Sequence, residues 1–271
     1  MQPVIDIHTH AFPDEIAAFA MPKLAAEADL TPALDGTLGA LLRSMDAAGI
    51  ARSVLLSIAT KPSQFDAIME WSRAIRSDRI EPFPSVHPAD PLARERLSMI
   101  AAEFRGVKLH PYYQDFQLDE ERLFPLYKRC ADLGLILLCH TGYDIAFPRD
   151  PRATPERILR VVERVPDLRL ITSHFGAWDD WAAVRKHLLG RPISMDVSYS
   201  FEFPDPDNHL DDILARHPPE YILFGSDSPW GDQRQTIERI RERVADPAAR
   251  AAILGGNAAR LLDADSSPVA T

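Results

Sequence analysis

A pair of histidines stands at the end of the first apolar run of the chain, with one residue between them. His8 and His10 follow the run Val4–Ile7, and side chains two residues apart on a strand point to the same side. Such a pair could present two imidazole nitrogens to one zinc ion, at about 2.0–2.1 Å. The alternative is a pair of histidines that faces solvent or is satisfied within a core. Further ligands at comparable positions would favour the metal.

More histidines do stand at comparable positions. Of the nine in the chain, six end or directly follow an apolar run: His8, His10, His87, His110, His140 and His174. A buried imidazole after the wholly apolar run Leu135–Leu138 and Cys139 would be costly without a partner, and a metal ion would supply one to His140. The alternative for His140 is a packing role. His174 is either a further ligand or a general acid or base, since its ordinary pKa lies near neutrality. We interpret His87 as structural.

An aspartate follows the last apolar run. Asp227 comes after Tyr221–Phe224 and Gly225 and precedes Pro229, so its carboxylate is expected to project from the end of this strand. As a metal ligand it would also accept a proton from metal-bound water. Its alternative role is that of a helix N-cap.

A lysine and a histidine, Lys108 and His110, are again two residues apart and share a face of one strand. A buried lysine is costly unless it is paired. Lys108 is therefore expected to bind a substrate carboxylate, or to be carbamylated and to bridge two metal ions. An ion pair with Asp6 or Asp196 inside the fold is the structural alternative.

The elements that must position these residues alternate regularly. Eight short apolar runs predict strands buried on both faces. The runs are Val4–Ile7, Ser53–Ile58, Ile80–Val86, Gly106–Leu109, Leu135–Cys139, Leu168–Thr172, Ile193–Val197 and Tyr221–Phe224. Helical patterns separate them, for example Leu38–Ala48, Gln64–Arg76, Pro91–Phe104, Glu120–Leu133, Thr154–Val165 and Gln235–Val244. Gly49 and Gly134 stand at expected helix C-caps, and Thr154 at an expected N-cap before Pro155.

This alternation over 271 residues predicts an α/β fold, a single-domain (β/α)8 TIM barrel, in which catalytic groups gather at the carboxyl ends of the strands. We assign residues 1–262 to the barrel and residues 263–271 to a flexible C-terminal tail.

Composition excludes several classes of protein. The net charge of −10 and the lack of a basic run argue against nucleic-acid binding. No membrane span or signal peptide is predicted, and two unpaired cysteines, Cys130 and Cys139, suit a reducing, cytoplasmic location. Strand alternation turns Cys139 away from His140, so a nucleophilic thiol is not expected. A homo-oligomer is compatible with the sequence, which does not reveal the oligomeric state.

Taken together, these residues resemble a known family, the amidohydrolase superfamily, and specifically the amidohydrolase-related branch of metal-dependent TIM-barrel hydrolases. The resemblance rests on Asp6-Ile7-His8-Thr9-His10, Lys108-Leu109-His110-Pro111, His140, His174 and Gly225-Ser226-Asp227-Ser228-Pro229-Trp230. The segment Gly256–Leu262 is similar to the usual C-terminal helix of that branch, so the resemblance covers residues 3 to about 262.

The resemblance implies which residues hold metal. It makes His8, His10, His140 and Asp227 the ligands of one divalent ion, with Zn²⁺ expected. His174 becomes a ligand of a second ion in binuclear members, or an acid or base in mononuclear ones. Lys108 falls on the strand that supplies a carbamylated lysine in some binuclear members, so the number of ions stays open.

We therefore predict a metal-dependent hydrolase that acts on an amide, lactone or other ester bond of a small, anionic molecule. Asp227 would take a proton from water, His174 would assist the oxyanion or the leaving group, and Lys108 with Arg149 would orient the substrate. Loop aromatic residues are expected to wall the pocket, namely Phe12, Tyr112, Tyr143, Trp178 and Trp230. The branch also contains non-oxidative decarboxylases of aromatic or unsaturated acids, which is the second hypothesis. A non-catalytic metal-binding barrel is the third.

Overall fold

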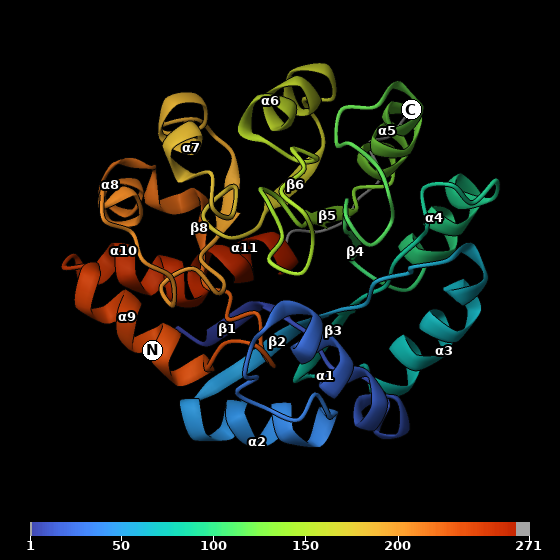
Figure 1. The fold of residues 1–271 in the computed structure, drawn as a ribbon, viewed down its shortest axis with the longest axis horizontal. Coiled ribbons are helices and arrows are strands. Elements are labelled where there is room, and N and C mark those ends of the chain that lie inside the picture. Colours follow the sequence, from blue (N-terminus) through green and yellow to red (C-terminus); the bar gives the residue numbers. More distant parts are fainter. Residues whose placement is uncertain (1, 264–271) are drawn as a thin grey trace.

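Eight parallel strands alternate with helices along the chain in the computed structural model, which describes residues 2–263 (Figure 1). The strands are β1 Val4–Thr9, β2 Ile50–Leu56, β3 Ile80–Phe83, β4 Gly106–Leu109, β5 Ile136–Cys139, β6 Arg169–Thr172, β7 Ser194–Asp196 and β8 Ile222–Leu223. They pair in sequence order as two parallel sheets, β1-β2-β3 and β4-β5-β6-β7-β8. The predicted α/β fold with parallel strands is confirmed.

Backbone hydrogen bonds join the two sheets at both seams. Lys108 N donates to Pro84 O at 2.8 Å between β4 and the end of β3, and Ile7 N donates to Phe224 O at 2.9 Å between β1 and the end of β8. The strands therefore follow one another around a ring with most of the helices outside it, the arrangement of a TIM barrel (Figure 1). Because all strands run the same way, their carboxyl ends open on one face.

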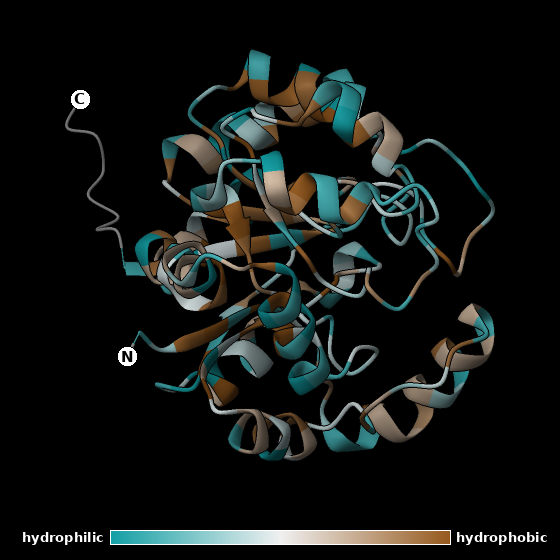
Figure 2. Cartoon of the chain, turned by 90° about the vertical axis from the view of Figure 1, so that its left-hand side faces the viewer, coloured by the Kyte–Doolittle hydropathy of each residue, from teal (hydrophilic) through white to brown (hydrophobic). Residues whose placement is uncertain are grey.

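Most helices cover the outside of this ring, and hydrophobic residues concentrate between them and the strands (Figure 2). The last helix instead packs Ala258 and Leu262 against residues that point into the ring. They are α1 Asp14–Ala28, α2 Leu38–Ala48, α3 Phe65–Ile75, α4 Ala93–Ala101, α5 Phe124–Asp132, α6 Pro155–Arg164, α7 Trp181–His187, α8 His209–Arg216, α9 Gln233–Arg243, α10 Pro247–Ala251 and α11 Asn257–Asp263. No helix in the described part of the chain has the length and apolar character needed to cross a bilayer.

Several element ends differ from the sequence prediction. The run Ile80–Val86 forms a strand only as far as Phe83, and the next residue, Pro84, has no N–H to donate and pairs with β4 only through its carbonyl oxygen. Gly49 and Gly134 have the left-handed φ of 71° and 66° that ends a helix, as predicted. Thr154 precedes α6 as expected, but its side chain makes no capping hydrogen bond.

Helix α1 was not among the predicted patterns, because its apolar residues form no single stripe and Pro22 lies within it. It belongs to the long connection between β1 and α2 and packs through Ala17, Met21 and Ala28, whereas Phe19 is 82% exposed. Asp263 ends α11, and the rest of the predicted tail lies outside the described residues.

Candidate active site

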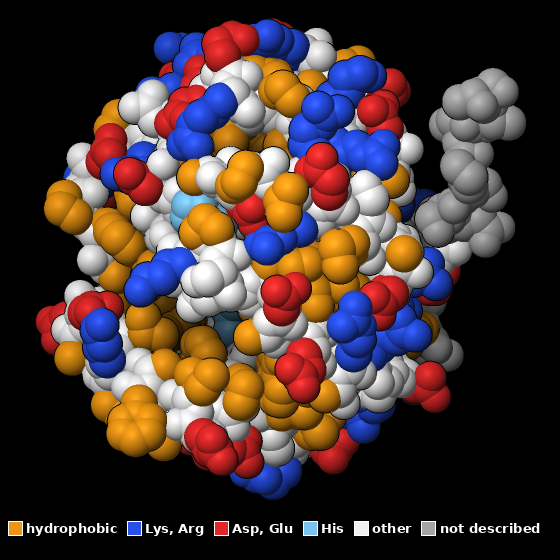
Figure 3. Space-filling view, turned by 90° about the vertical axis from the view of Figure 1, so that its right-hand side faces the viewer, with side chains coloured by type: hydrophobic (Ala, Val, Ile, Leu, Met, Phe, Trp, Pro, Cys, Tyr) orange, Lys and Arg blue, Asp and Glu red, His pale blue; other side chains and the backbone are white. Residues whose placement is uncertain are grey.

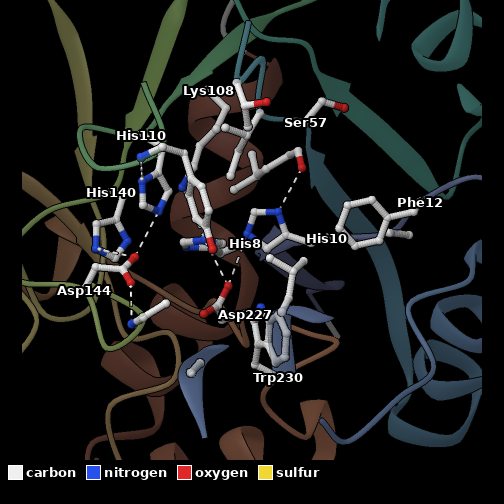
Figure 4. Close-up of a pocket in the computed structure, with 18 of the residues that line it drawn as sticks. His8, His10, Phe12, Ser57, Lys108, His110, His140, Asp144, Asp227 and Trp230 are labelled. Carbon is white, nitrogen blue, oxygen red and sulfur yellow. Dashed lines mark hydrogen bonds and ion pairs between the residues drawn. The ribbon is translucent and has the colours of Figure 1, made fainter. Parts of the chain in front are cut away.

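One cavity of about 440 Å³ collects the predicted site residues at the carboxyl ends of the strands (Figure 4). This volume is in the range of small-molecule sites. The predicted residues that line it are His8, His10, Lys108, His140, His174 and Asp227.

Two histidines and one aspartate form what we call the His8 cluster: His8, His10 and Asp227. Each offers one ligand atom, and these atoms lie within 4.8 Å of one another. Asp227 Oδ1 is 3.3 Å from His8 Nε2 and 3.2 Å from His10 Nε2. Ligand atoms that surround one zinc ion tetrahedrally at about 2.0–2.1 Å lie about 3.3 Å apart. The spacing of the cluster therefore fits a divalent ion.

The outer nitrogens of this cluster are held by acceptors. His8 Nδ1 donates to Asp196 Oδ2 at 2.8 Å, and His10 Nδ1 donates to the carbonyl oxygen of Leu56 at 2.9 Å. In a neutral imidazole with hydrogen on Nδ1, Nε2 carries the lone pair, so both Nε2 atoms are free to bind metal. Burial, aided by Lys108, lowers the pKa of His8 to about 4, so this ring is neutral at pH 7.

Both carboxylates of this region are ionised. Burial alone would raise the pKa of Asp227, but His8 and His10 outweigh it and hold that pKa below its ordinary value. The pKa of Asp196 is lowered against the same burial by His8, with further hydrogen bonds from Ser198. An anionic ligand and an anionic residue behind His8 both suit a divalent cation.

The backbone at the site is unusual. Asp227 and His174 have left-handed φ values of 59° and 57°, which few non-glycine residues adopt and which cluster at functional sites. Gly225 lies against the cluster, since a Cβ there would be 2.9 Å from His8 Cβ and 3.3 Å from Asp196 Cβ. A glycine is needed so that β8 can approach His8 and Asp196.

A second group with the same residue types, the His110 cluster, consists of His110, His140 and Asp144. Asp144 Oδ2 is 3.3 Å from His110 Nε2 and 3.6 Å from His140 Nε2, and the two rings stack with centroids 4.2 Å apart. The Tyr113 N–H donates to His110 Nδ1 at 3.5 Å, which places the hydrogen of that ring on Nε2. Burial is the largest cause that lowers the pKa of both histidines well below 6.5.

His140 and His174 form a pair between two carbonyl groups. His174 Nδ1 is 2.9 Å from Ser198 O, and His140 Nε2 is 2.9 Å from Tyr143 O, so each of these nitrogens must donate. The two inner nitrogens, His174 Nε2 and His140 Nδ1, then face each other at 3.1 Å. If both rings are neutral, each of these two nitrogens carries a lone pair, and the two lone pairs repel each other. A cation bound between the two nitrogens would remove this repulsion.

Lys108 is fully buried, and its Nζ lies 3.5 Å from His8 Nε2. Burial lowers its pKa. Among the described residues no carboxylate makes an ion pair with it, so the expected alternative pairing with Asp6 or Asp196 is not found. Asp6 instead accepts hydrogen bonds from Ser226 and Gln233, and burial raises its pKa to about 7.

Some of the other predicted residues line the cavity, and others lie outside its lining. Phe12, Trp178 and Trp230 line the cavity, whereas Tyr112 and Tyr143 are not among the lining residues. Arg149 also lies outside the lining, where it pairs with Asp179 and covers the ring of Tyr143. His87 accepts a local hydrogen bond from Ala89 N. Burial raises the pKa of the Cys139 thiol to about 12, which agrees with an inert cysteine.

Sequence reasoning missed several residues of the site. From the sequence, Asp196 is predicted only as a possible ion-pair partner of Lys108, and Asp144, Ser198 and Tyr113 are not predicted to be in the site at all. Asp196 ends β7, so its strand-end position was a usable signal. Asp144 and Tyr113 stand in loops that no periodic pattern marks.

A family model described as amidohydrolase matches residues 5–264. The chain belongs to the amidohydrolase family. It is therefore an enzyme of a metal-dependent family, and the His8 cluster supplies residues that fit a divalent ion. No curated protein sequence matches this chain.

Solved structures of low sequence identity share the fold. An uncharacterised TIM-barrel protein from Bordetella bronchiseptica has a TM-score of 0.76 at 22% identity and covers 96% of this chain and 98% of its own. A putative 2-pyrone-4,6-dicarboxylic acid hydrolase from Pseudomonas putida has a TM-score of 0.68 at 20% identity, over 97% of this chain and 98% of its own. A dihydroxybenzoic acid decarboxylase from Polaromonas with bound manganese and 2-nitroresorcinol has a TM-score of 0.70 at 16% identity, over 97% of each chain. Hydrolases and decarboxylases thus share this architecture.

Proposed function

We propose that this member of the amidohydrolase family is a hydrolase that cleaves an amide, lactone or other ester bond of a small molecule with one anionic or strongly polar end. The observation that carries the proposal is the His8 cluster, where two Nε2 lone pairs and an ionised carboxylate converge at the floor of a cavity. His8, His10 and Asp227 would hold the ion, for which Zn²⁺ is our candidate. A bound divalent ion supplies Lewis-acid polarisation and makes water at the site a stronger acid.

The protein's own groups then have separate tasks. Asp227, ionised at neutral pH, would take the proton of the attacking water on its carboxylate. Lys108 Nζ lies 3.5 Å from His8 Nε2 and would orient the anionic end of the substrate. His174, when protonated on both ring nitrogens, would give the proton on Nε2 to the leaving group and keep the Nδ1 hydrogen that it donates to Ser198 O. Asp196 would keep hydrogen on His8 Nδ1 throughout.

The pair His140–His174 bears on the number of ions. Its inner nitrogens are 3.1 Å apart, near the spacing of two ligands of one ion. In a two-ion enzyme we assign both nitrogens, with a carbamylated Lys108, to the second ion. In a one-ion enzyme His174 keeps its role as proton donor. Elemental analysis of the purified protein separates the two, at two ions or one ion per chain.

Decarboxylation is the second candidate, and two features of the cavity support it. Lys108 could receive one carboxylate, and an apolar cavity penalises a charged carboxylate more than neutral carbon dioxide. His174 would then deliver a proton to carbon.

One experiment separates the two reactions. The metal-loaded protein is incubated in ¹⁸O-labelled water with panels of lactones, aryl esters, N-acyl amides and aromatic acids. Hydrolysis predicts one ¹⁸O atom in the acid product and no carbon dioxide. Release of carbon dioxide without ¹⁸O in the organic product would replace our proposal by the decarboxylase. Full metal content with no turnover on either panel would contradict both.

A further inference from the structure

The cavity extends from the two clusters to side chains of α1, α3 and the loop after α1. We call five of these the α1–α3 wall: Ile16, Leu24, Leu30, Ile68 and Trp71. α1 lies in the connection after β1, and α3 follows β2, so both elements begin near the strand ends that carry the site (Figure 1). One cavity therefore has a polar floor and an apolar wall.

Charge is confined to the floor. Among the residues that line the cavity, the charged types are Lys108, Asp144 and Asp227, together with the histidines, and none is arginine or glutamate. Proteins commonly hold carboxylates through the paired N–H groups of arginine. A second carboxylate that reached the α1–α3 wall, away from Lys108 and the proposed ion, would find no cationic side chain and would lose its hydration.

Two large apolar residues at the cavity are exposed. Ile16 on α1 is 53% exposed and Ile145, in the loop after β5, is 40% exposed, although both line the cavity. Figure 3 shows a hollow in the surface with hydrophobic side chains around it and a histidine inside. A bound apolar group would remove these side chains from water, which lowers the free energy by about 25 cal/mol per Å².

We propose that the substrate carries a single anionic or polar reacting end and an uncharged, apolar tail that packs on the α1–α3 wall. This rests on the proposed function for the assignment of the reacting end. The wall makes Leu24 and Ile68 determinants of specificity, and it excludes dicarboxylates as substrates.

A homologous series of ligands tests this directly, by calorimetric titration of the metal-loaded protein. The probes are butanoate, hexanoate, octanoate and the matched dicarboxylate suberate. We expect the dissociation constant to fall about fourfold for each added methylene. Suberate, which ends in a second charge, should bind at least tenfold more weakly than octanoate. Affinity that does not change with chain length, or suberate that binds as tightly as octanoate, would overturn the proposal.

Variants of the wall, each with a matched control, test whether the wall causes the dependence of affinity on chain length. Ile68 and Leu24 are only partly buried, so Ile68→Gln and Leu24→Gln should fold, and glutamine keeps the helical preference. Each should weaken octanoate about tenfold while butanoate changes less than twofold. The matched controls are Phe19→Gln on α1 and Glu70→Gln on α3, both exposed and outside the lining, which should leave the series unchanged. An equal loss of octanoate affinity in the wall variants and in the controls would contradict a role for the wall.

The failure of this proposal differs from the failure of the proposed function. Lys108→Met should weaken all the acids by a similar factor, because their common carboxylate loses the cation that orients it, while the dependence on chain length persists. Chain-length dependence without any hydrolysis would leave the wall established and the hydrolase proposal refuted. Hydrolysis of short esters, together with affinities that do not depend on chain length, would support the hydrolase proposal and refute the wall.

Discussion

The His8 cluster and the His110 cluster each contain two histidines and one aspartate, yet their hydrogens are arranged in opposite ways. In the first, both Nδ1 atoms donate to oxygen atoms behind them, and the Nε2 atoms that face Asp227 carry lone pairs. In the second, His110 Nδ1 accepts from the backbone and His140 Nε2 donates to Tyr143 O, so the nitrogens near Asp144 carry hydrogen.

This difference shows that residue types alone do not define a metal site. The partners behind the rings decide which nitrogen carries a lone pair. We therefore expect the ion at Asp227 and none at Asp144, and His140 to act through its other nitrogen, toward His174. Variants of both clusters and of the residues next to them test this difference.

The largest effect is expected from the ligands of the His8 cluster. His8→Ala or Asp227→Ala should abolish both metal binding and activity, because each removes a ligand atom. Elemental analysis and the activity assay check this, with His87→Ala as control, since His87 also follows a strand but lies outside the cavity lining. Full metal occupancy in both variants would refute the assignment.

Lys108→Met should lower kcat/KM about 100-fold, the equivalent of one charged hydrogen bond to the substrate. If Lys108 only orients substrate, the metal-to-protein ratio stays as in the wild type. If it bridges two ions, the ratio falls by one. Unchanged activity together with an unchanged ratio would remove Lys108 from the site altogether.

Asp196→Asn removes the charge behind His8 but keeps the shape of the side chain. Metal affinity should fall roughly 10–100-fold, as is typical for the residue behind a histidine ligand. Competition with a chelator of known affinity measures it. An affinity equal to that of the wild type would show that the Asp196 contact does not tune His8.

Asp144→Asn should have the smallest effect. Because the nitrogens that face Asp144 carry hydrogen, metal affinity should not change, and kcat/KM should change less than tenfold. The same chelator competition applies here. A loss of affinity as large as that of Asp196→Asn would reverse the comparison of the two clusters.

Much of the fold could be predicted because it depends on local patterns. Apolar runs such as Leu135–Cys139 and turn glycines such as Gly49 are properties of short segments. The ends of the strands were predicted less well, since β3 ends at Phe83, inside an apolar run that continues to Val86. Helix α1 has no amphipathic stripe, so its contribution to the cavity became visible only from the fold.

For the site, strand-end positions predicted the lining residues but not their partners. His8 and Asp196 are 188 residues apart, and no short pattern relates them. The grouping of His140 with His110 and His174, away from the His8 cluster, depends in the same way on how β4, β5 and β6 lie side by side. Only long-range geometry fixes which nitrogen of each ring is free.

The most direct test is an anomalous difference map from crystals of the metal-loaded protein, recorded at the absorption edge of the bound metal. We predict a peak bounded by His8 Nε2, His10 Nε2 and Asp227, and none beside Asp144. A peak among His110, His140 and Asp144, with none at the His8 cluster, would show that the ion is held by the other cluster.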